Sequence, residues 1–391
     1  MSTLAETLDR ITVDELRARG SLKWTEAGPD ALGAFVAEMD FGTAPAVTDA
    51  LTDAIRRYDF GYLPDAVAAE MADACATWYR QRYGWDVDAA HIHPLPDVVK
   101  GLEVAITALT RPDSPIILPT PAYMPFLWVP KVLGREIIQV PMVASGGRMT
   151  LDLAGIDAAY EAGGHLLVLC NPCNPVGRVY EPDELAAVSA VVERHGGRVF
   201  SDEIHAPLVY PGHRHVPYAS LSPATAAHTV TATSASKAWN LPGLKCAQIL
   251  LTSQADIAAW ESVGMLTSHG ASTPGTRANT AAYRGGGDWL AEIVGYLDGN
   301  RRLLGELLAE HLPDIGYSQP EGTYLAWLDC RSTGLGDSPA PFFRDRAGVV
   351  FNDGPTFGLA GRGHVRLNFA TPRPVLAEIV RRMAAALHDL S

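Results

Sequence analysis

The sequence predicts an α/β protein with a large lobe built on a mainly parallel sheet and a smaller α+β lobe at the C-terminal end. Between about residues 116 and 251, short apolar or β-branched runs alternate with helical segments, which is the pattern of βαβ units. Beyond them, a long amphipathic helix precedes two alternating strands. At 391 residues and 47% hydrophobic, the chain is long and apolar enough to bury two cores.

We predict three parts along the chain. Residues 1–45 form an N-terminal arm that joins the small domain, residues 46–287 form the large domain, and residues 288–391 form the small domain. The arm is expected to hold short helical pieces, because Gly28-Pro29 and Thr43-Ala44-Pro45 interrupt it.

The individual elements follow from periodicity. Apolar side chains repeating every 3.6 residues predict a helix, and an apolar or alternating run bounded by turn residues predicts a strand. The predicted helices are Val47 to Arg57, Ala66 to Tyr83, Ala255 to Gly264, Thr276 to Arg284, Trp289 to Leu312 and Val375 to Leu390. The predicted strands are Pro115 to Leu118, Glu136 to Val140, Leu166 to Cys170, Arg198 to Phe200, Thr229 to Ala232, Cys246 to Leu251, Thr323 to Leu328 and His364 to Phe369. Val349 to Phe351 is short enough to be either a strand or a loop.

Charge and composition argue against several classes of function. The net charge of −13 and the lack of a long basic run disfavour a nucleic-acid partner. No apolar stretch is long enough to span a bilayer, and the first residues lack the basic and apolar regions of a signal peptide. Five cysteines are an odd and sparse set, which fits reduced thiols. We therefore expect a cytoplasmic protein that does not bind a membrane.

One lysine stands directly behind two serines. Ser234 and Ser236 precede Lys237, and a second cation, Lys245, follows shortly after. An aldehyde cofactor with a phosphate tail needs this arrangement, because one amine forms the Schiff base while hydroxyls and a cation hold the phosphate. Serine–lysine pairs also occur in many surface loops, so the pattern alone is weakly specific. The chain's other lysines are Lys23, Lys100 and Lys131.

Upstream of this lysine, an apolar run ends in two acids. Val199-Phe200-Ser201 precedes Asp202-Glu203, which predicts a buried parallel strand with an acid at its carboxyl end. A carboxylate that pairs with the ring nitrogen of pyridoxal phosphate keeps the nitrogen protonated, so that the ring accepts electrons from the substrate Cα. Without Lys237, a strand-end cap would be the better interpretation of Asp202. With it, we predict a pyridoxal phosphate site.

Two further strand ends deliver an aromatic and an amide side chain. In an open α/β sheet, ligands bind beyond the carboxyl ends of the strands. Tyr123 follows one predicted strand and could stack on the cofactor ring, although a core position suits it equally. Asn174 follows another and could hydrogen-bond the cofactor's phenolic oxygen, although Asn-Pro is also turn chemistry.

Cysteine and histidine patterns offer alternative functions. Cys170-Asn171-Pro172-Cys173 has the spacing of metal and redox motifs, but a zinc site would need a second pair. The motif also leads into a turn and does not open a helix, so we predict neither role. We interpret His91-Ile92-His93 as a polar loop and not as a ligand pair, and we expect no metal.

Short motifs that are typical of one enzyme family are distributed along nearly the whole chain. They are Val36 to Phe41, Phe60-Gly61-Tyr62, Pro121-Ala122-Tyr123, Cys170 to Pro175, Ser201 to His205, Ser236 to Leu244, Tyr296 to Arg301, Pro320 to Trp327 and Val365 to Asn368. The set resembles fold-type I pyridoxal-phosphate enzymes of the class I/II aminotransferase superfamily. Within it, the chain is similar to the MalY/PatB branch of cystathionine β-lyases, also called C–S β-lyases. This resemblance implies a seven-stranded type of sheet in the large domain.

The resemblance also implies roles that the residues alone do not assign. Arg366 matches the arginine that binds the substrate α-carboxylate, and the resemblance implies further substrate contacts from Ala37, Asn174 and Tyr62. Tyr62 matches the tyrosine that reaches the cofactor phosphate of the neighbouring subunit, which implies a homodimer with shared active sites. Val98 and Val99 stand where the family offers backbone N–H groups of a helix N-terminus to that phosphate.

Some positions depart from the patterns of relatives. His205 replaces the tyrosine of typical aminotransferases, which favours the lyase branch. Asp97 occupies a place in the phosphate turn where a small residue is usual, and an acid beside a phosphate is unfavourable unless it caps the helix. Lys100 could offset it. Lys245 stands where many relatives use arginine, giving a compact charge in place of a planar fork.

We predict a lyase that converts an S-substituted L-cysteine, such as cystathionine, to pyruvate, ammonia and a thiol. Freed Lys237 would take the Cα proton, while Asp202 and Tyr123 serve the cofactor ring. An aminotransferase is the first alternative and would share these residues. Other cofactor chemistry on a cysteine conjugate, such as decarboxylative deamination, is a second. A regulatory protein acting through a protein partner is a third, and no extra domain supports it.

Overall fold

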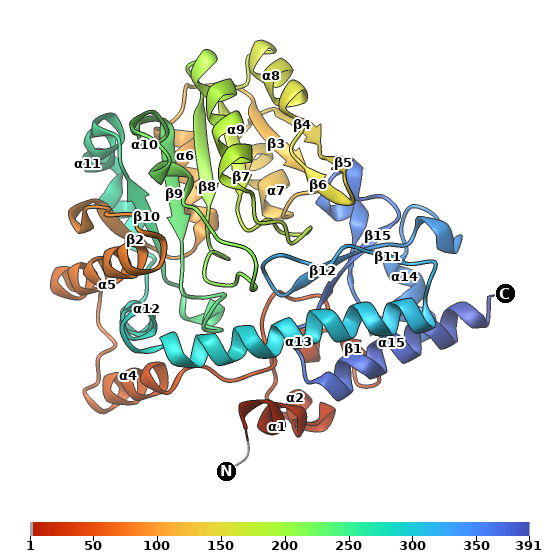
Figure 1. The fold of residues 1–391 in the computed structure, drawn as a ribbon. Coiled ribbons are helices and arrows are strands. Elements are labelled where there is room, and N and C mark those ends of the chain that lie inside the picture. Colours follow the sequence, from red (N-terminus) through yellow and green to blue (C-terminus); the bar gives the residue numbers. More distant parts are fainter. Residues whose placement is uncertain (1–2, 391) are drawn as a thin grey trace.

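The computed structural model describes residues 3–390, which form a seven-stranded sheet, a four-stranded sheet, two two-stranded pairs, a set of covering helices and an N-terminal arm (Figure 1). The arm contains α1 (Leu4–Asp9), α2 (Val13–Ala18), α3 (Leu22–Thr25) and the two-residue strand β1 (Leu32–Gly33). The short helical pieces predicted for the arm are thus confirmed. Thr3 and Thr12 start α1 and α2 with capping boxes. Each threonine hydroxyl accepts from the backbone N–H of a glutamate three residues later, and the carboxylate of that glutamate accepts from the threonine N–H.

The larger sheet has seven strands in the order β2-β10-β9-β8-β7-β3-β4. Its strands are β2 (Ile92–Leu95), β3 (Ile116–Thr120), β4 (Ile137–Pro141), β7 (Leu166–Cys170), β8 (Arg198–Asp202), β9 (Thr229–Thr233) and β10 (Ala247–Leu251). The neighbours from β9 to β4 pair in parallel, whereas β10 runs antiparallel to both β9 and β2. A mainly parallel sheet was predicted, and it is confirmed.

Helices cover both faces of this sheet. One face carries α6 (Val98–Ala108), α7 (Pro125–Val132) and α11 (Gln254–Ser268), and the other carries α8 (Leu153–Glu161), α9 (Pro182–Arg194) and α10 (Pro223–His228). Each face has its own buried cluster, with Leu118 and Phe200 in the first and Ile117 and Val199 in the second. This alternation along β3 and β8 is the period-two pattern of strands buried on both sides. A hairpin of β5 (Val143–Ser145) and β6 (Arg148–Thr150) follows β4.

The second sheet lies in the C-terminal part and has four strands in the order β11-β12-β15-β14. Its strands are β11 (Gly316–Tyr317), β12 (Leu325–Asp329), β14 (Asn352–Asp353) and β15 (His364–Asn368), accompanied by α14 (Ala340–Phe342) and α15 (Arg373–His388). The segment that the sequence left open as strand or loop contains β13 (Val349–Val350), which pairs in parallel with β1 of the arm. The arm therefore joins the C-terminal part through backbone pairing.

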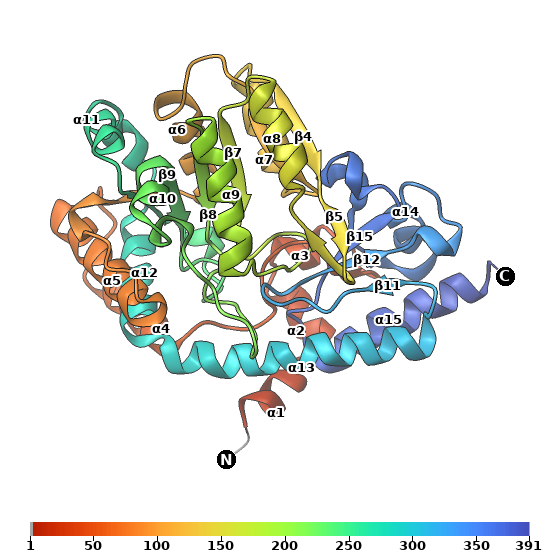
Figure 2. The same ribbon diagram turned by 45° about the horizontal axis from the view of Figure 1, so that its top comes forward.

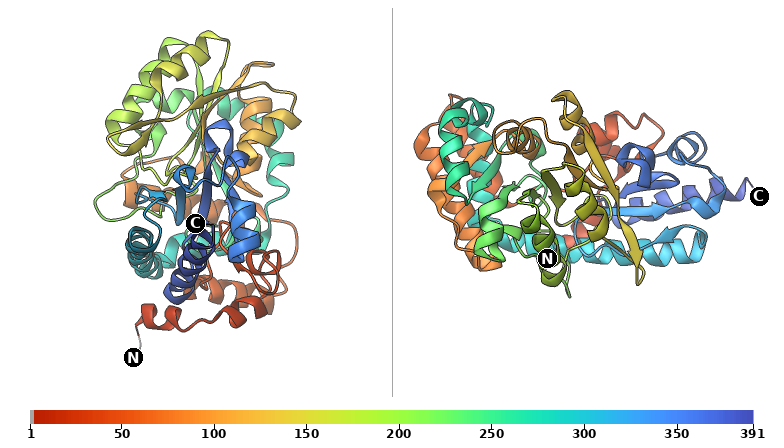
Figure 3. Two further views of the ribbon diagram at one scale, coloured as in Figure 1. Left: turned by 90° about the vertical axis from the view of Figure 1, so that its right-hand side faces the viewer. Right: turned by 90° about the horizontal axis from the view of Figure 1, so that it is seen from above.

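The longest helix, α13 (Gly287–His311), runs below both sheets and connects them (Figures 1 and 2). Seen from above, α4 (Pro45–Arg56), α5 (Asp65–Tyr83) and α12 (Thr273–Gly285) lie at one end of the molecule and the C-terminal elements at the other (Figure 3). No helix within residues 3–390 is long and apolar enough to cross a membrane. The domain limits at residues 45 and 287 stay a prediction.

One local prediction was wrong. His91-Ile92-His93 was expected to be a polar loop, but Ile92 and His93 belong to β2. His93 pairs with Ile249 of β10, and its ring stacks on Trp260 at a centroid distance of 4.7 Å. The strand was hard to predict because only four residues form it, at an edge of the sheet and without an apolar run.

Candidate active site

A cavity of about 220 Å³ opens at the carboxyl ends of the parallel strands. Most of the residues predicted for the site line it, namely Ala37, Val98, Val99, Tyr123, Asn174, Asp202, His205, Ser234, Ser236, Lys237 and Lys245. They come from the arm, from the start of α6, from the ends of β3, β7, β8 and β9, and from the segment before β10. The fold thus gathers side chains that are far apart in the sequence.

Lys237 follows β9 and points its amine toward the arm. Its Nζ donates a 2.7 Å hydrogen bond to the carbonyl oxygen of Ala37. Burial and, to a lesser extent, the nearby positive charge of Arg366 together lower the pKa of Lys237 to about 8. A substantial fraction of this amine is therefore neutral near pH 8, as a nucleophile or a general base requires.

Asp202 is the last residue of β8 and is 4% exposed. Its Oδ1 accepts a 3.0 Å hydrogen bond from the backbone of Ile204. Burial raises the pKa of this carboxyl to about 7, although the Ile204 bond and the charge of Lys237 act in the opposite direction. A cationic ring nitrogen facing Asp202 would relieve that burial cost, because it would give the carboxylate an opposite charge.

The opposite end of the cavity is suited to an anion. Val98 and Val99 are the first residues of α6, so their N–H groups have no acceptor within the helix. Ser234 and Ser236 lie close together, since the Ser236 N–H donates to Ser234 Oγ at 3.0 Å. Lys245 provides the cation at this end of the cavity.

Asp97, which departs from the expected pattern, has two contacts here. Its Oδ1 caps α6 by accepting from the Lys100 N–H at 2.9 Å. Its Oδ2 lies 2.5 Å from Lys245 Nζ. The side chain of Lys100 instead pairs with Glu103 at 2.6 Å, so Lys100 does not offset Asp97 as had been considered. The acid is thus both a helix cap and a partner of the cation at the anion end.

Two ring side chains border the middle of the cavity. Burial raises the pKa of Tyr123, whose ring packs edge-on against Phe126. His205 is 2% exposed, and its Nδ1 has no hydrogen-bond partner among residues 3–390. Burial, followed by the charges of Lys237 and Arg366, lowers the pKa of His205 well below its usual value. The imidazole is therefore neutral at physiological pH and has a ring nitrogen free to bond a ligand.

Arg366 lies on β15 beside the cavity and is 2% exposed. It donates to Asn174 Oδ1 at 3.0 Å, to the Phe35 carbonyl at 2.8 Å and to Asn352 Oδ1 at 2.6 Å. Its guanidinium also lies 5.1 Å from the centre of the Phe357 ring. All these partners are neutral, and Arg366 Nε has no hydrogen-bond partner among the described residues. A buried cation without a carboxylate partner is suited to binding an acid.

Arg366 and Tyr62 are the two predicted site residues that do not line this cavity themselves. Arg366 contacts its wall through Asn174, whereas Tyr62 lies away from it. Its side chain is 87% exposed and its ring lies 5.5 Å from that of His269. Both line a separate surface pocket together with Met265. A role for Tyr62 in a cavity thus requires a second subunit.

Sequence reasoning missed Tyr324. Its hydroxyl donates to the Ala37 carbonyl at 2.9 Å, and its ring packs edge-on against His205 with centroids 6.0 Å apart. Tyr324 is part of the motif Pro320 to Trp327 noted above, but nothing in the sequence indicated which motif residue faces the site. Cys170 and Cys173 are free thiols, and no group of three metal-binding side chains occurs in residues 3–390.

The residues present fit pyridoxal phosphate. A helix N-terminus with hydroxyls and a cation suits a phosphate, a buried carboxylate suits a ring nitrogen, and a lysine amine of lowered pKa suits an aldehyde. The unpartnered nitrogen of His205 and the neutral contacts of Arg366 leave two polar groups that a bound cofactor and an amino acid would satisfy. The chemistry of the side chains thus agrees with the cofactor predicted from the sequence.

Comparison with known proteins gives consistent matches. The family model for aminotransferase class I and II matches residues 35–383. Cystathionine beta-lyase of Corynebacterium glutamicum is 39% identical over 377 residues, which cover 96% of this chain and 99% of that protein. Cystathionine beta-lyase PatB of Bacillus subtilis is 33% identical over 376 residues, which cover 94% of this chain and 96% of that protein.

The fold has a close match among solved structures. A crystal structure from Corynebacterium diphtheriae, of a protein assigned as a PLP-dependent β-cystathionase, gives a TM-score of 0.91 at 42% sequence identity. The match covers 97% of this chain and 98% of that one. The predicted fold-type I architecture is thereby confirmed.

Proposed function

We propose that this chain cleaves S-substituted L-cysteines. It belongs to the aminotransferase class I and II family and, within it, to the cystathionine β-lyases of the MalY/PatB type. The chain is a pyridoxal-phosphate-dependent C–S lyase of the cystathionine β-lyase kind. The products of such cleavage are pyruvate, ammonia and a thiol.

One observation carries the choice of an amino acid as substrate. Arg366 is buried and positively charged, its hydrogen-bond acceptors within residues 3–390 are neutral, and one of them, Asn174, lines the cavity that contains the Lys237 amine. An α-amino acid whose carboxylate binds Arg366 supplies the missing negative charge. Lys237, whose pKa is lowered by burial and by the positive charge of Arg366, is the amine of this cavity that is able to remove the Cα proton.

We assign the cofactor contacts by chemistry. When bound, pyridoxal phosphate supplies an aldehyde that bonds to amines and a ring that withdraws electrons from the substrate Cα. Asp202 would hold the ring nitrogen in its protonated form, and Tyr123 would cover the ring. Val98, Val99, Ser234, Ser236 and Lys245 would hold the phosphate, and His205 and Asn174 would hydrogen-bond the ring substituents.

The reaction follows from what Lys237 and Arg366 do. Arg366 holds the carboxylate, so the substrate cannot rotate away from Lys237. Neutral Lys237 takes the Cα proton, and the electron pair left on Cα expels the thiolate from Cβ. Water completes the conversion, so that one thioether amino acid and one water give pyruvate, ammonium and a thiol. Lys237 then carries a proton that can be returned to the leaving sulfur.

We also propose a homodimer in which each cavity receives Tyr62 from the other chain. Tyr62 is 87% exposed, and Tyr58, Met265 and Leu266 are between 78% and 83% exposed. Large apolar side chains exposed to this degree favour an interface with another protein surface. Because Tyr62 resembles the tyrosine that binds the cofactor phosphate of the neighbouring subunit, the interface would complete the phosphate site of each cavity.

We place the protein in the cytoplasm. All five cysteines are free in residues 3–390, which fits a compartment that keeps thiols reduced. Cell fractionation against a cytoplasmic marker tests this location, and recovery with exported proteins would contradict it.

The function is tested by product analysis of the purified holoenzyme. With cystathionine and with simple S-alkyl cysteines, we expect thiol, pyruvate and ammonia in equal amounts without an added keto acid. A second assay pairs an amino acid with a keto acid. Brisk amino-group exchange without thiol release would replace the lyase proposal by the aminotransferase alternative. Release of carbon dioxide from the substrate would instead support decarboxylative deamination.

A further inference from the structure

The arm crosses the cavity as an irregular segment, Phe35–Phe41, which we name the strap. It contains no helix or strand, yet every one of its backbone carbonyls accepts a hydrogen bond from a side chain. The donors are Arg366 to Phe35, Asn368 to Val36 and Glu38, Lys237 and Tyr324 to Ala37, Asn240 to Met39 and Phe41, and Arg19 to Asp40. Side chains of other segments thus hold the strap in place, because its backbone belongs to no helix or sheet.

Two of these donors are the groups that perform the reaction. Lys237 Nζ lies 2.7 Å from the Ala37 carbonyl, and Arg366 Nη2 lies 2.8 Å from the Phe35 carbonyl. Displacing the strap by about 1 Å would remove an acceptor from both, and misplacement on that scale can cost about a hundredfold in rate. The position of the strap therefore determines how the base and the carboxylate-binding group are oriented.

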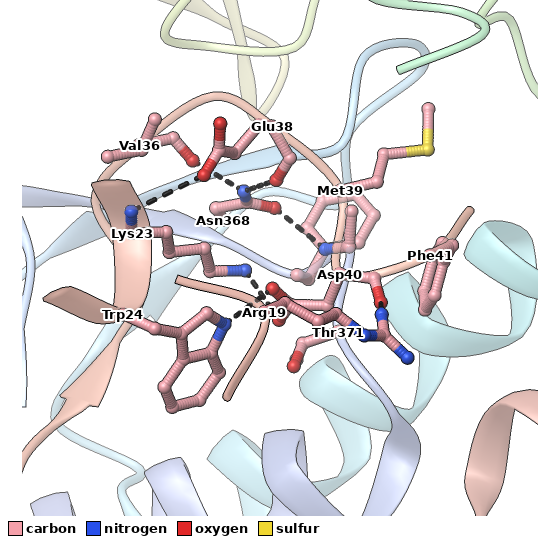
Figure 4. Close-up of polar contacts among 12 residues, drawn as sticks. Arg19, Lys23, Trp24, Val36, Glu38, Met39, Asp40, Phe41, Asn368 and Thr371 are labelled. Carbon is pink, nitrogen blue, oxygen red and sulfur yellow. Dashed lines mark hydrogen bonds and ion pairs between the residues drawn. The ribbon is translucent and has the colours of Figure 1, made fainter. Parts of the chain in front are cut away.

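A buried ion pair anchors the strap at Asp40 (Figure 4). Asp40 Oδ2 lies 2.7 Å from Lys23 Nζ, and Asp40 Oδ1 accepts from Trp24 Nε1 at 2.7 Å. The side chains of Lys23 and Asp40 are 0% and 2% exposed, and neither residue lines the cavity. The Asp40 backbone N–H donates to the Ala370 carbonyl at 2.9 Å, beyond the end of β15. One residue thus ties the strap to α3 and to the segment that directly follows β15, the strand that carries Arg366.

Stability alone does not explain such a pair. Two charges removed from water regain little net stability from each other, and well-packed apolar residues of similar volume are often as good or better. Directional bonds are what an apolar pair cannot supply. The Asp40 carboxylate has one acceptor oxygen for each of two donors on α3, which fixes both its position and its orientation.

We infer that Asp40, together with Lys23, is a positioning residue for the lyase reaction: the pair holds the strap so that Ala37 and Phe35 present their carbonyls to Lys237 and Arg366. This inference rests on the roles proposed above for Lys237 and Arg366. Asp40 acts through the strap and touches no reacting atom.

Three variants separate positioning from folding. Asp40→Asn keeps an acceptor for Trp24 and removes the charge that holds Lys23. The double variant Lys23→Met, Asp40→Asn removes both charges, so that no unpaired charge remains buried. Asp256→Asn is the matched control, because it breaks the Arg198–Asp256 pair, whose side chains are 15% and 4% exposed, away from the strap.

The first measurement is hydrogen exchange of peptides that contain Phe35–Phe41, followed by mass spectrometry of the holoenzymes. We expect exchange in these peptides to accelerate at least about tenfold in both Asp40 variants and to stay unchanged in Asp256→Asn. The second is steady-state kinetics with an S-alkyl cysteine. We expect kcat to fall about 10- to 100-fold and KM to rise in both Asp40 variants, while the double variant recovers the melting temperature of the wild type.

The outcomes are decisive in either direction. Recovery of turnover together with melting temperature in the double variant would overturn the inference, because the pair would then serve stability only. Unchanged exchange in the strap would overturn it as well. If wild-type protein releases no thiol, the proposed function fails by itself. The inference is then judged by strap exchange and by the rate at which apoenzyme attaches pyridoxal phosphate, which must fall in both Asp40 variants.

Discussion

Arg366 on β15 donates a 3.0 Å hydrogen bond to Asn174 Oδ1 in the loop after β7. This bond joins the four-stranded sheet to the seven-stranded one at the edge of the cavity. Asn174 cannot neutralise the guanidinium, and burial lowers the pKa of Arg366 to about 10. The cation therefore gains more from an incoming carboxylate than an exposed arginine would.

We predict that Arg366→Met lowers kcat/KM for S-alkyl cysteines about 10- to 150-fold, mainly through KM. A hydrogen bond to a charged group contributes about 1.5–3 kcal/mol, and this variant removes the charge altogether. Arg362→Met is a suitable control, because the Arg362 side chain is 60% exposed and its one ion pair within the described residues, 3–390, is with Asp337. Equal kinetics of the two variants would exclude Arg366 from carboxylate binding.

We predict that the apoenzyme attaches pyridoxal phosphate through Lys237 at a rate that rises with pH and levels off above about 8. Only the neutral amine attacks the aldehyde, and burial with Arg366 lowers the pKa of Lys237 to about 8. Below that value, the neutral fraction falls about tenfold per pH unit. Visible absorbance follows the attachment, and borohydride reduction with peptide mapping identifies the residue.

Arg366→Met gives this profile an internal check. Removing a positive neighbour favours the ammonium form, so the pKa of Lys237 rises and the plateau moves to higher pH. Cofactor trapped on Lys100 or Lys245 would contradict the assignment. So would a wild-type profile that still rises steeply at pH 10, since an ordinary lysine has a pKa of about 10.4.

We predict that Asp202→Asn still binds the cofactor but loses on the order of 10³-fold in turnover, or roughly 4 kcal/mol. The amide keeps the shape and can still accept from Ile204, but it cannot keep a ring nitrogen protonated. Quantifying bound cofactor in the same sample separates loss of binding from loss of chemistry. Near-normal turnover would show that Asp202 does not serve the ring.

We predict that Asp97→Asn binds pyridoxal phosphate more tightly than the wild type. Asn caps α6 as well as Asp does, but it neither repels the phosphate nor competes for Lys245, which lies 2.5 Å from Asp97. The gain should be modest, a few-fold in Kd, because both side chains are about half exposed and water screens their charges. Lys245→Met should weaken binding. Weaker binding by Asp97→Asn would indicate that Asp97 instead orients Lys245 for the phosphate.

Most of the architecture could be predicted from the sequence, because the periodicity of a long segment indicates whether it forms a helix or a strand. The helix predicted at Trp289 to Leu312 is α13, and the strand predicted at Leu166 to Cys170 is β7 with the same bounds. Strand β2 was missed because its four residues are set by pairing with β10, which lies more than 150 residues further along the chain.

The site was predictable where chemistry follows strand ends, as at Asp202 and Asn174. It was not predictable where position depends on contacts between distant segments. The strap is one case, since nothing near Ala37 in the sequence indicates that Lys237 and Tyr324 will meet its carbonyl. Asp97 is another, because its pairing with Lys245 arises only when α6 and the segment before β10 come together.

The predicted contribution of Tyr62 to the partner's cavity can be tested by combining two impaired chains in one dimer. Tyr62→Ala should weaken the phosphate site of the partner, and Lys237→Ala should abolish chemistry in its own cavity. In a hybrid dimer, one cavity combines Lys237 from the first chain with Tyr62 from the second. Co-expression with different affinity tags, followed by tandem purification, yields that hybrid. We expect it to regain up to about half of wild-type turnover at limiting cofactor, with one of its two sites intact.

The matched control pairs Lys237→Ala with Asp202→Asn. Lys237 and Asp202 both line the cavity of their own chain. A hybrid of these two variants would have an intact cavity only if one of the two residues acted in the partner's cavity. Since neither does, each cavity keeps a defect and the hybrid should stay inactive. Because Tyr62 is 87% exposed and lies outside its own cavity, recovery in the Tyr62 hybrid alone would show that it acts across the interface. Equal activity of the two hybrids, or a monomer in light scattering, would exclude shared sites.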